Sequence, residues 1–155
     1  MAFTVDIEIK KRFKVKASVS TVHELLADVP ESASHFPKVD QLVDLGDNCY
    51  RWEMEKIGLD KYNLQTVYAC QYRSNKRAGT VIWEPLEDEG NALVEGQWTF
   101  KKATPSGTNV TLATTATIEM PFPKLVKFVV GPLVEREFQG LIEEYIENLK
   151  ETLNG

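Results

Sequence analysis

The chain has 155 residues, a length typical of one domain with a sizeable buried core. Apolar residues make up 43% and charged residues 26%, which is ordinary for a globular protein and argues against disorder. The formal net charge of −5 argues against a broad nucleic-acid-binding surface. The N-terminus lacks the apolar region of a signal peptide, and no run reaches the ~20 apolar residues of a membrane span. We therefore expect a single cytoplasmic domain over residues 1–155.

The first predicted element is a long strand near the N-terminus. Its apolar residues fall on odd positions, at Phe3, Val5, Ile7, Ile9, Phe13, Val15 and Ala17. This period of two is typical of a strand with one buried and one solvated face. Lys11 interrupts the apolar row. It indicates either a bulge or a snorkelling side chain, with a cation pointing inward as the alternative.

Two short helices are predicted next. Over residues 18–28, Thr21 and Glu24 fit a capping box, in which side chains satisfy the first free amides of a helix. Pro30 is expected to end this helix, and residues 31–36 form the second one. The apolar stripe of the first helix consists of Val22, Leu25, Leu26 and Val29.

The middle of the chain predicts a series of antiparallel strands separated by turns. The expected strands cover residues 38–45, 49–57, 62–73, 80–86, 92–101 and 110–120. Turn residues separate them, for example at 46–48, 58–61 and 105–107. The acidic turn that contains Glu84, Glu87, Asp88 and Glu89 is expected to be a solvated edge.

A long amphipathic helix is predicted at the C-terminus. Its apolar stripe recurs every three or four residues, at Val134, Phe138, Leu141, Ile142, Tyr145, Ile146, Leu149 and Leu153. Pro132 follows Gly131 and is expected to occupy the first turn, where proline loses no hydrogen bond. Residues 121–130 would then form a separate apolar segment that leads into the helix.

This order of elements resembles the helix-grip fold of the START/Bet v 1-like (SRPBCC) superfamily. The most similar stretches are residues 22–28, 36–39 and 45–52. Among the branches of the superfamily, the chain looks most similar to the polyketide cyclase/dehydrase-like proteins and to proteins like the G subunit of carbon monoxide dehydrogenase. The resemblance implies an α+β fold, with a seven-stranded curved antiparallel sheet wrapped around a long C-terminal helix and two short helices between strands 1 and 2. It also implies an elongated cavity between sheet and helix, where superfamily members bind sterols, lipids, hormones or polyketides.

The candidate ligand-binding residues lie on the rows that should face this cavity, on the segment before the C-terminal helix, or on that helix. They are Lys11, Tyr50, Trp52, Met54, Thr66, Tyr68, Trp98, Phe100, Thr114, Phe128 and Phe138. The aromatic residues either line a pocket or fill it. Thr66 and Thr114 each need a hydroxyl partner, for which backbone or water is preferred to a ligand. Lys11, if it points inward, would meet an anionic ligand.

The remaining chemically active residues favour structural roles. His23 lies off the apolar stripe of its helix and is expected to be exposed, whereas His35 is expected to pack in a loop. Cys49 and Cys70 lack metal-like spacing, so free thiols in a reducing compartment are expected. We expect no metal site and no cofactor.

Three functions are compatible with the sequence. The preferred one is binding, and by extension transport, of a hydrophobic or amphipathic small molecule or lipid. A polyketide cyclase/dehydratase-like enzyme is less favoured, because the inward rows offer only Lys11 and tyrosines for acid–base chemistry. The third is an accessory protein that touches a membrane or partner protein through the apolar segment from Pro121 to Gly131, which otherwise forms a lid or static packing.

Overall fold

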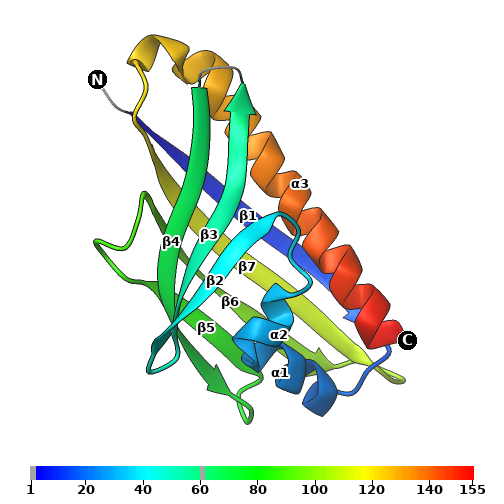
Figure 1. Cartoon of the computed structure of the whole chain (residues 1–155). Coiled ribbons are helices and arrows are strands. Elements are labelled where there is room, and N and C mark those ends of the chain that lie inside the picture. Colours follow the sequence, from blue (N-terminus) through cyan, green and yellow to red (C-terminus); the bar gives the residue numbers. More distant parts are fainter. Residues whose placement is uncertain (1–2, 60–61) are drawn as a thin grey trace.

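The computed structural model describes residues 3–59 and 62–155. A seven-stranded antiparallel sheet, in the order β1-β7-β6-β5-β4-β3-β2, curls around one long helix (Figure 1). The elements are β1 (Phe3–Val15), α1 (Val19–Ala27), α2 (Val29–Ala33), β2 (Val39–Gly46), β3 (Cys49–Leu59), β4 (Tyr62–Asn75), β5 (Thr80–Pro85), β6 (Ala92–Lys102), β7 (Thr108–Met120), the 3-10 helix η1 (Lys124–Val126) and α3 (Lys127–Asn154). The predicted helix-grip fold is confirmed.

The strands form where apolar and polar residues alternate in the sequence, and the ends of the strands differ slightly from the prediction. β3 continues to Leu59 and therefore includes the first half of the predicted turn at 58–61, whose other half lies outside the described residues. β1 pairs with β7 in an unbroken register from Phe3–Met120 to Val15–Thr108. Across this described part of the chain, no helix has an apolar stretch long enough to cross a membrane.

Lys11 lies within the regular part of β1, opposite Leu112 of β7. The predicted bulge is therefore wrong, and so is the alternative of a cation pointing inward, because the Lys11 side chain is 40% exposed. Its Nζ atom lies 3.7 Å from Glu143 Oε1 on α3. The snorkelling interpretation is confirmed: the aliphatic stem starts on the apolar side of the strand, and the charge reaches the surface.

The two short helices follow one another with different caps from those predicted. Ser18 Oγ accepts a hydrogen bond from the Thr21 amide at 3.2 Å, so the cap is Ser18, and the capping box of Thr21 and Glu24 is wrong. Asp28 ends α1 and caps α2, where its Oδ1 accepts from the Glu31 amide at 3.2 Å. Pro30 therefore lies in the first turn of α2, where proline is well tolerated, and does not itself end α1.

The helix α3 begins earlier than predicted. It starts at Lys127 and contains Pro132 in its interior, so the prediction that Pro132 starts the helix is wrong. Val130 and Val134 are both buried, and their packing holds the first turns in place despite the missing amide of Pro132. These first turns lie at an angle to the rest of α3, as expected at a proline (Figure 1).

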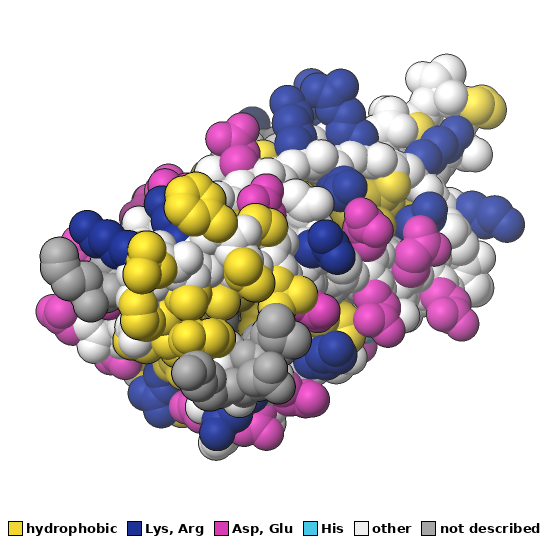
Figure 2. All heavy atoms as spheres, turned by 90° about the horizontal axis from the view of Figure 1, so that it is seen from above, with side chains coloured by type: hydrophobic (Ala, Val, Ile, Leu, Met, Phe, Trp, Pro, Cys, Tyr) yellow, Lys and Arg dark blue, Asp and Glu magenta, His cyan; other side chains and the backbone are white. Residues whose placement is uncertain are grey.

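The first turns of α3 and η1 form one end of the molecule, opposite α1 and α2 (Figure 1). Hydrophobic side chains gather on the surface at this end (Figure 2). The rest of α3 buries its apolar stripe against the sheet and, together with the concave side of the sheet, forms the main core. The predicted stripe from Val134 to Leu153 is confirmed.

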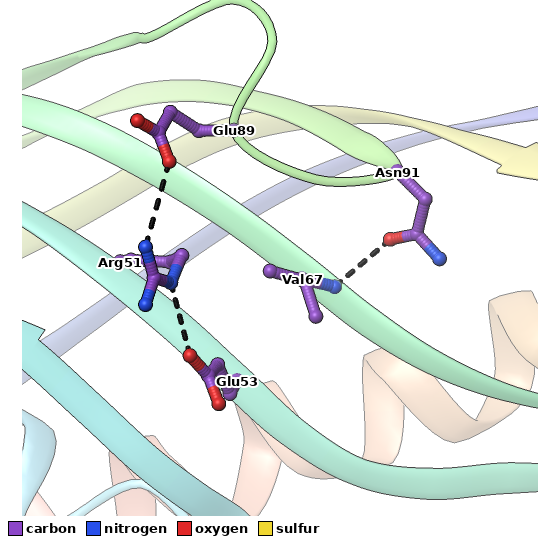
Figure 3. Close-up of polar contacts among 5 residues, drawn as sticks. All are labelled: Arg51, Glu53, Val67, Glu89 and Asn91. Carbon is purple, nitrogen blue, oxygen red and sulfur yellow. Dashed lines mark hydrogen bonds and ion pairs between the residues drawn. The ribbon is translucent and has the colours of Figure 1, made fainter.

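The loop between β5 and β6 completes one edge of β4. β5 pairs only with residues 70–75 of β4, so the earlier half of this edge needs other partners. Asn91 supplies them, since its Oδ1 accepts from the Val67 amide at 2.8 Å and its Nδ2 donates to the Gln65 carbonyl at 2.9 Å (Figure 3). The side chain of Asn91 therefore replaces a length of strand.

The same loop is also tied to β3 by charge. Arg51 Nε donates to Glu53 Oε2 at 2.9 Å, and Arg51 Nη1 lies 3.6 Å from Glu89 Oε2 (Figure 3). Glu84 pairs with Arg73 on β4. Glu84 thus lies on β5 rather than in the turn, and Glu84, Glu87 and Asp88 are exposed, as expected of a solvated edge. Glu84 and Glu89 also pair with arginines of neighbouring strands.

Candidate functional site

A small cavity of about 60 Å³ lies between the concave side of the sheet and the helices α2 and α3. The strands β3 to β7 supply one wall, and α3 supplies the other. The lining residues are Leu26, Val29, Ser32, Phe36, Trp52, Tyr68, Tyr72, Val81, Trp83, Val94, Trp98, Leu112, Thr114, Phe138, Ile142 and Tyr145. The cavity is much smaller than the elongated one implied by the resemblance, because aromatic rings occupy most of the space.

The rings around the cavity form a connected set. Trp52 and Tyr68 stack at 5.8 Å between ring centroids, with 11° between their planes. Trp83 lies 6.5 Å from Trp98, and Trp98 meets the ring of Tyr145 edge-on at 5.9 Å. All three tryptophans of the chain therefore line one cavity.

The position of Trp83 depends on a glycine. Trp83 on β5 lies opposite Gly96 on β6. A Cβ atom at position 96 would lie 2.7 Å from Trp83 Cζ2, so only glycine leaves room for the indole. Trp83 was not among the predicted site residues, because the neighbouring Ile82 is apolar and hides the alternation of Val81 and Trp83 toward the inside.

Hydrogen bonds within the protein fix the polar atoms of the cavity. Ser32 on α2 is hydrogen-bonded to the Tyr145 hydroxyl on α3. The Trp52 indole donates to the Tyr72 hydroxyl at 2.8 Å. Thr114 Oγ1 donates to the Glu95 carbonyl at 2.9 Å, which confirms the preferred backbone partner for this residue. The cavity thus offers pre-positioned hydroxyl groups rather than charges.

Every ionisable group that lines the cavity is a tyrosine. Burial raises the pKa values of Tyr68 and Tyr72 well above the usual range. Burial also raises the pKa of Tyr145, to about 12, although hydrogen bonds with Ser32 and Trp98 act in the opposite direction. The lining residues are therefore neutral near pH 7, and a charged ligand would lose its hydration without gaining a counter-ion.

The cavity brings together part of the predicted site. Of those residues, Trp52, Tyr68, Trp98, Thr114 and Phe138 line it. The alternation of residues along the strands predicted the inward side correctly for the four members of this group on strands, which are Trp52, Tyr68, Trp98 and Thr114.

The other predicted residues lie elsewhere. Met54 and Thr66 are buried but do not line the cavity, and Phe100 is buried beside His23, at 5.8 Å between the rings. Tyr50 is half-buried and contacts the ring of Tyr72 from outside the cavity, at 6.0 Å.

Lys11 and Phe128 both lie at the surface. Neither residue lines the cavity, so the alternative of an inward Lys11 is wrong, and Phe128 is 85% exposed on the first turn of α3.

Several lining residues were absent from the prediction. Tyr72 continues the inward row of Tyr68, and Tyr145 belongs to the predicted helical stripe, so both carried a usable signal. Ser32 carried none, because its role depends on contact with Tyr145, far away in the sequence.

The histidines and cysteines serve the fold. His35 Nδ1 donates to the Glu31 carbonyl at 2.9 Å, and its Nε2 lies 2.8 Å from Thr152 Oγ1, which confirms the packing role. The predicted exposure of His23 is wrong, because the ring is half-buried and its Nε2 is buried without a hydrogen-bond partner. Burial raises the pKa of Cys70 to about 12. Within residues 3–59 and 62–155, no three His, Cys, Asp or Glu side chains are grouped as metal ligands would be.

Known structures share this architecture. A START superfamily protein from Mycobacterium smegmatis superposes with a TM-score of 0.65 at 14% identity, covering 94% of this chain and 96% of that one. The Zhui aromatase/cyclase from Streptomyces sp. R1128 gives a TM-score of 0.62 at 13% identity, covering 96% and 91%. A protein from Thermus thermophilus gives 0.64 at 18% identity, covering 96% of each chain. At these identities the similarity shows the fold alone.

The sequence itself matches a known family over nearly its whole length. No curated protein sequence is similar enough to match the chain. Residues 6–154, however, match the family described as polyketide cyclase/dehydrase and lipid transport. The chain therefore belongs to the polyketide cyclase/dehydrase and lipid transport family, and it has the START-like fold.

Proposed function

We propose that this protein binds a small, uncharged molecule that contains an aromatic or similarly flat ring, in the cavity described above. The observation that carries the proposal is the convergence of Trp52, Trp83 and Trp98 on one cavity whose lining is free of charged groups. Flat rings stack favourably on indole and phenol faces, at about 0.5–1.5 kcal/mol per pair beyond simple burial. The family description, which covers polyketide and lipid chemistry, supports an apolar ligand.

The size of the cavity supports a ring rather than an acyl chain. Sites for drug-sized ligands enclose roughly 300–1,000 Å³, and an engineered cavity of about 150 Å³ holds benzene. The cavity of about 60 Å³ is smaller than either, so a ligand must displace side chains. Moving one or two rings, such as those of Trp83 and Trp98, makes room for a ring-sized guest. A long lipid chain would require rearrangement along the whole core.

The Ser32–Tyr145 pair gives the site a means of orienting such a guest. A ligand hydroxyl or carbonyl can insert into this hydrogen bond, because each hydroxyl has both a donor and acceptor positions. A guest without a polar atom would leave the pair intact and gain only from burial. We therefore expect phenol-like or ketone-like ring compounds to bind more tightly than pure hydrocarbons.

Calorimetric titration tests the proposal. The probes are 2-naphthol, which is neutral at pH 7, and palmitate, which carries a chain and a charge. We expect 2-naphthol to bind at one site per chain, and Trp98→Leu to weaken binding. Leu93→Ala, a change at an exposed residue of the same strand, should leave binding unchanged. Binding of neither probe, or of palmitate alone, would overturn the proposal.

Catalysis of a cyclisation or dehydration is the second candidate. The Ser32–Tyr145 pair favours it, because a hydroxyl held in the cavity could polarise a substrate carbonyl. The pKa of Tyr145, raised to about 12, makes this group a poor general base at neutral pH. Binding without acid–base catalysis is therefore the better-supported function.

A further inference from the structure

We propose that the end of the molecule formed by residues 121–134 docks on a lipid bilayer that contains anionic lipids. Three large apolar side chains in this apolar end are exposed to solvent: Leu125 at 89%, Phe128 at 85% and Val129 at 59%. Their spacing of three and four residues places them on the same side of η1 and the first turns of α3. Figure 2 shows hydrophobic side chains gathered at this end.

This exposure is unusual for the molecule. The opposite side of the same turns is buried through Val130 and Val134, so the segment is apolar on both its inner and its outer side. Among the residues that the structure describes, the other exposed large hydrophobics are Leu45 at 38% and Leu93 at 43%, on different strands. A cluster of exposed apolar side chains marks an interaction surface, whereas single ones need no explanation.

Charge indicates an anionic surface as the partner. The apolar end contains Lys124 and Lys127, both exposed, and no acidic residue. The whole chain carries a net charge of −5, so the remaining residues carry −7. A negative membrane surface attracts the apolar end and repels the rest of the molecule, which favours one orientation. The lysine ammonium groups can reach lipid headgroups while their stems remain beside the apolar side chains.

The shape favours a bilayer over a protein partner. The exposed side chains of Leu125, Phe128 and Val129 belong to η1 and the first turns of α3. This short helical segment lies at one tip of the molecule (Figure 1). A stable protein interface buries roughly 800 Å² on each partner and needs a matching surface. A bilayer requires no matching surface, because a helix can lie in the interface with its apolar side among the acyl chains.

Docking in this way brings the cavity near the bilayer. Phe138, which lines the cavity, follows Phe128 by ten residues of helix, or about 15 Å. An apolar ligand could then pass between membrane and cavity over a short path. The docking inference itself does not depend on what the cavity binds.

Cosedimentation with vesicles tests the inference on the full chain. One set of vesicles consists of phosphatidylcholine alone, and the other also contains phosphatidylglycerol. We expect binding to the anionic vesicles, weakened at high salt and by charge reversal of Lys124 and Lys127 to Glu. Phe128→Glu should reduce the partition coefficient about tenfold or more, since it removes a large apolar group from the lipid. The matched control, Leu93→Glu, changes an exposed leucine elsewhere and should bind as the original protein does.

Three results would overturn the inference: no binding to anionic vesicles, equal binding by the Phe128→Glu variant, or self-association through this end that Phe128→Glu abolishes. Calorimetry with 2-naphthol separates this inference from the proposed function. If the protein binds 2-naphthol but not anionic vesicles, the docking inference is wrong and the proposed function stands. If it binds the vesicles but not 2-naphthol, the proposed function is wrong and the docking inference stands.

Discussion

The indole of Trp83 occupies the space that a side chain at Gly96 would need. The two residues lie opposite each other on β5 and β6, and a Cβ atom at position 96 would come within 2.7 Å of the ring and 2.5 Å of the Ala113 carbonyl oxygen. The wall of the cavity therefore depends on a residue that lacks a side chain.

Gly96→Ala should lower the free energy of unfolding by about 1–3 kcal/mol, because neither the Ala113 backbone nor the indole can move without cost. The same variant should lose affinity for 2-naphthol, since the displaced ring enters the cavity. Urea unfolding and calorimetry measure the two effects. Gly140→Ala is the matched control. Its Cβ meets nothing within 4 Å on an exposed helical position, so stability should rise by about 0.5–1 kcal/mol. An unchanged stability of Gly96→Ala would contradict the packing described.

The Ser32–Tyr145 hydrogen bond should show strong coupling in a double-mutant cycle. Both residues are buried, so removing one hydroxyl leaves the other without this partner, at a cost of about 1–3 kcal/mol. Removing both, in Ser32→Ala with Tyr145→Phe, should cost less than the sum of the single changes. Denaturant unfolding of the four proteins provides the coupling free energy. Strictly additive effects would show that the two hydroxyls do not stabilise each other.

His23 should make stability depend on pH. Burial lowers its pKa from 6.5, and the nearby charge of Lys76 lowers it further, while Glu24 opposes the shift. The unfolded chain therefore binds a proton at higher pH than the folded one. The stabilisation of the folded protein by neutral His23 is fully present above pH 6.5 and is lost as the pH falls through the pKa of His23 in the folded state.

His23→Gln should flatten this decline, which begins near the ordinary histidine pKa of about 6.5 and continues at lower pH, toward the lowered pKa of the folded protein. Thermal unfolding across that range is the measurement. Lys76→Gln should reduce the slope only in part, because burial is the larger cause of the shift. A slope that is the same in all three proteins would mean that His23 has no shifted pKa.

The side chain of Asn91 should contribute more to the free energy of unfolding than the ion pairs of Arg51 beside it. Its side chain makes two hydrogen bonds to the backbone of β4, so Asn91→Ala leaves the Val67 amide without its side-chain acceptor and should cost about 1–3 kcal/mol. Arg51→Gln removes partly exposed ion pairs that solvent screens, so it should lower the free energy of unfolding less than Asn91→Ala does. Asn91→Asp keeps the acceptor but not the donor, and its effect should fall between those of the other two variants. Urea unfolding ranks the variants by their free energy of unfolding. A larger decrease for Arg51→Gln than for Asn91→Ala would contradict the role given to Asn91.

The sequence predicts the fold well because its signals are local. Alternation in the strands and a three-to-four-residue period in α3 follow from backbone geometry, and both were confirmed. The start of α3 was missed because Pro132 carries a strong local preference, which the burial of Val130 and Val134 outweighs. Local signals alone could not show that competition.

The cavity could be predicted only in part, for a related reason. The alternation of apolar and polar residues predicts which side of a strand faces inward, but it does not show which part of that side lines a cavity. Met54 shares the inward side with Trp52 but lies outside the cavity. That difference depends on contacts between distant segments, such as Ser32 with Tyr145, which no spacing in the sequence reveals.

The most direct test of the central claim uses the tryptophan indoles. The chain has only Trp52, Trp83 and Trp98, and all three line the cavity. A nitrogen–proton correlation NMR spectrum therefore contains three indole signals, each a reporter of the site. On titration with 2-naphthol, we predict that all three signals shift, saturate together and fit one dissociation constant. Indole signals that stay unchanged while 2-naphthol approaches its solubility limit would contradict a ring-binding cavity.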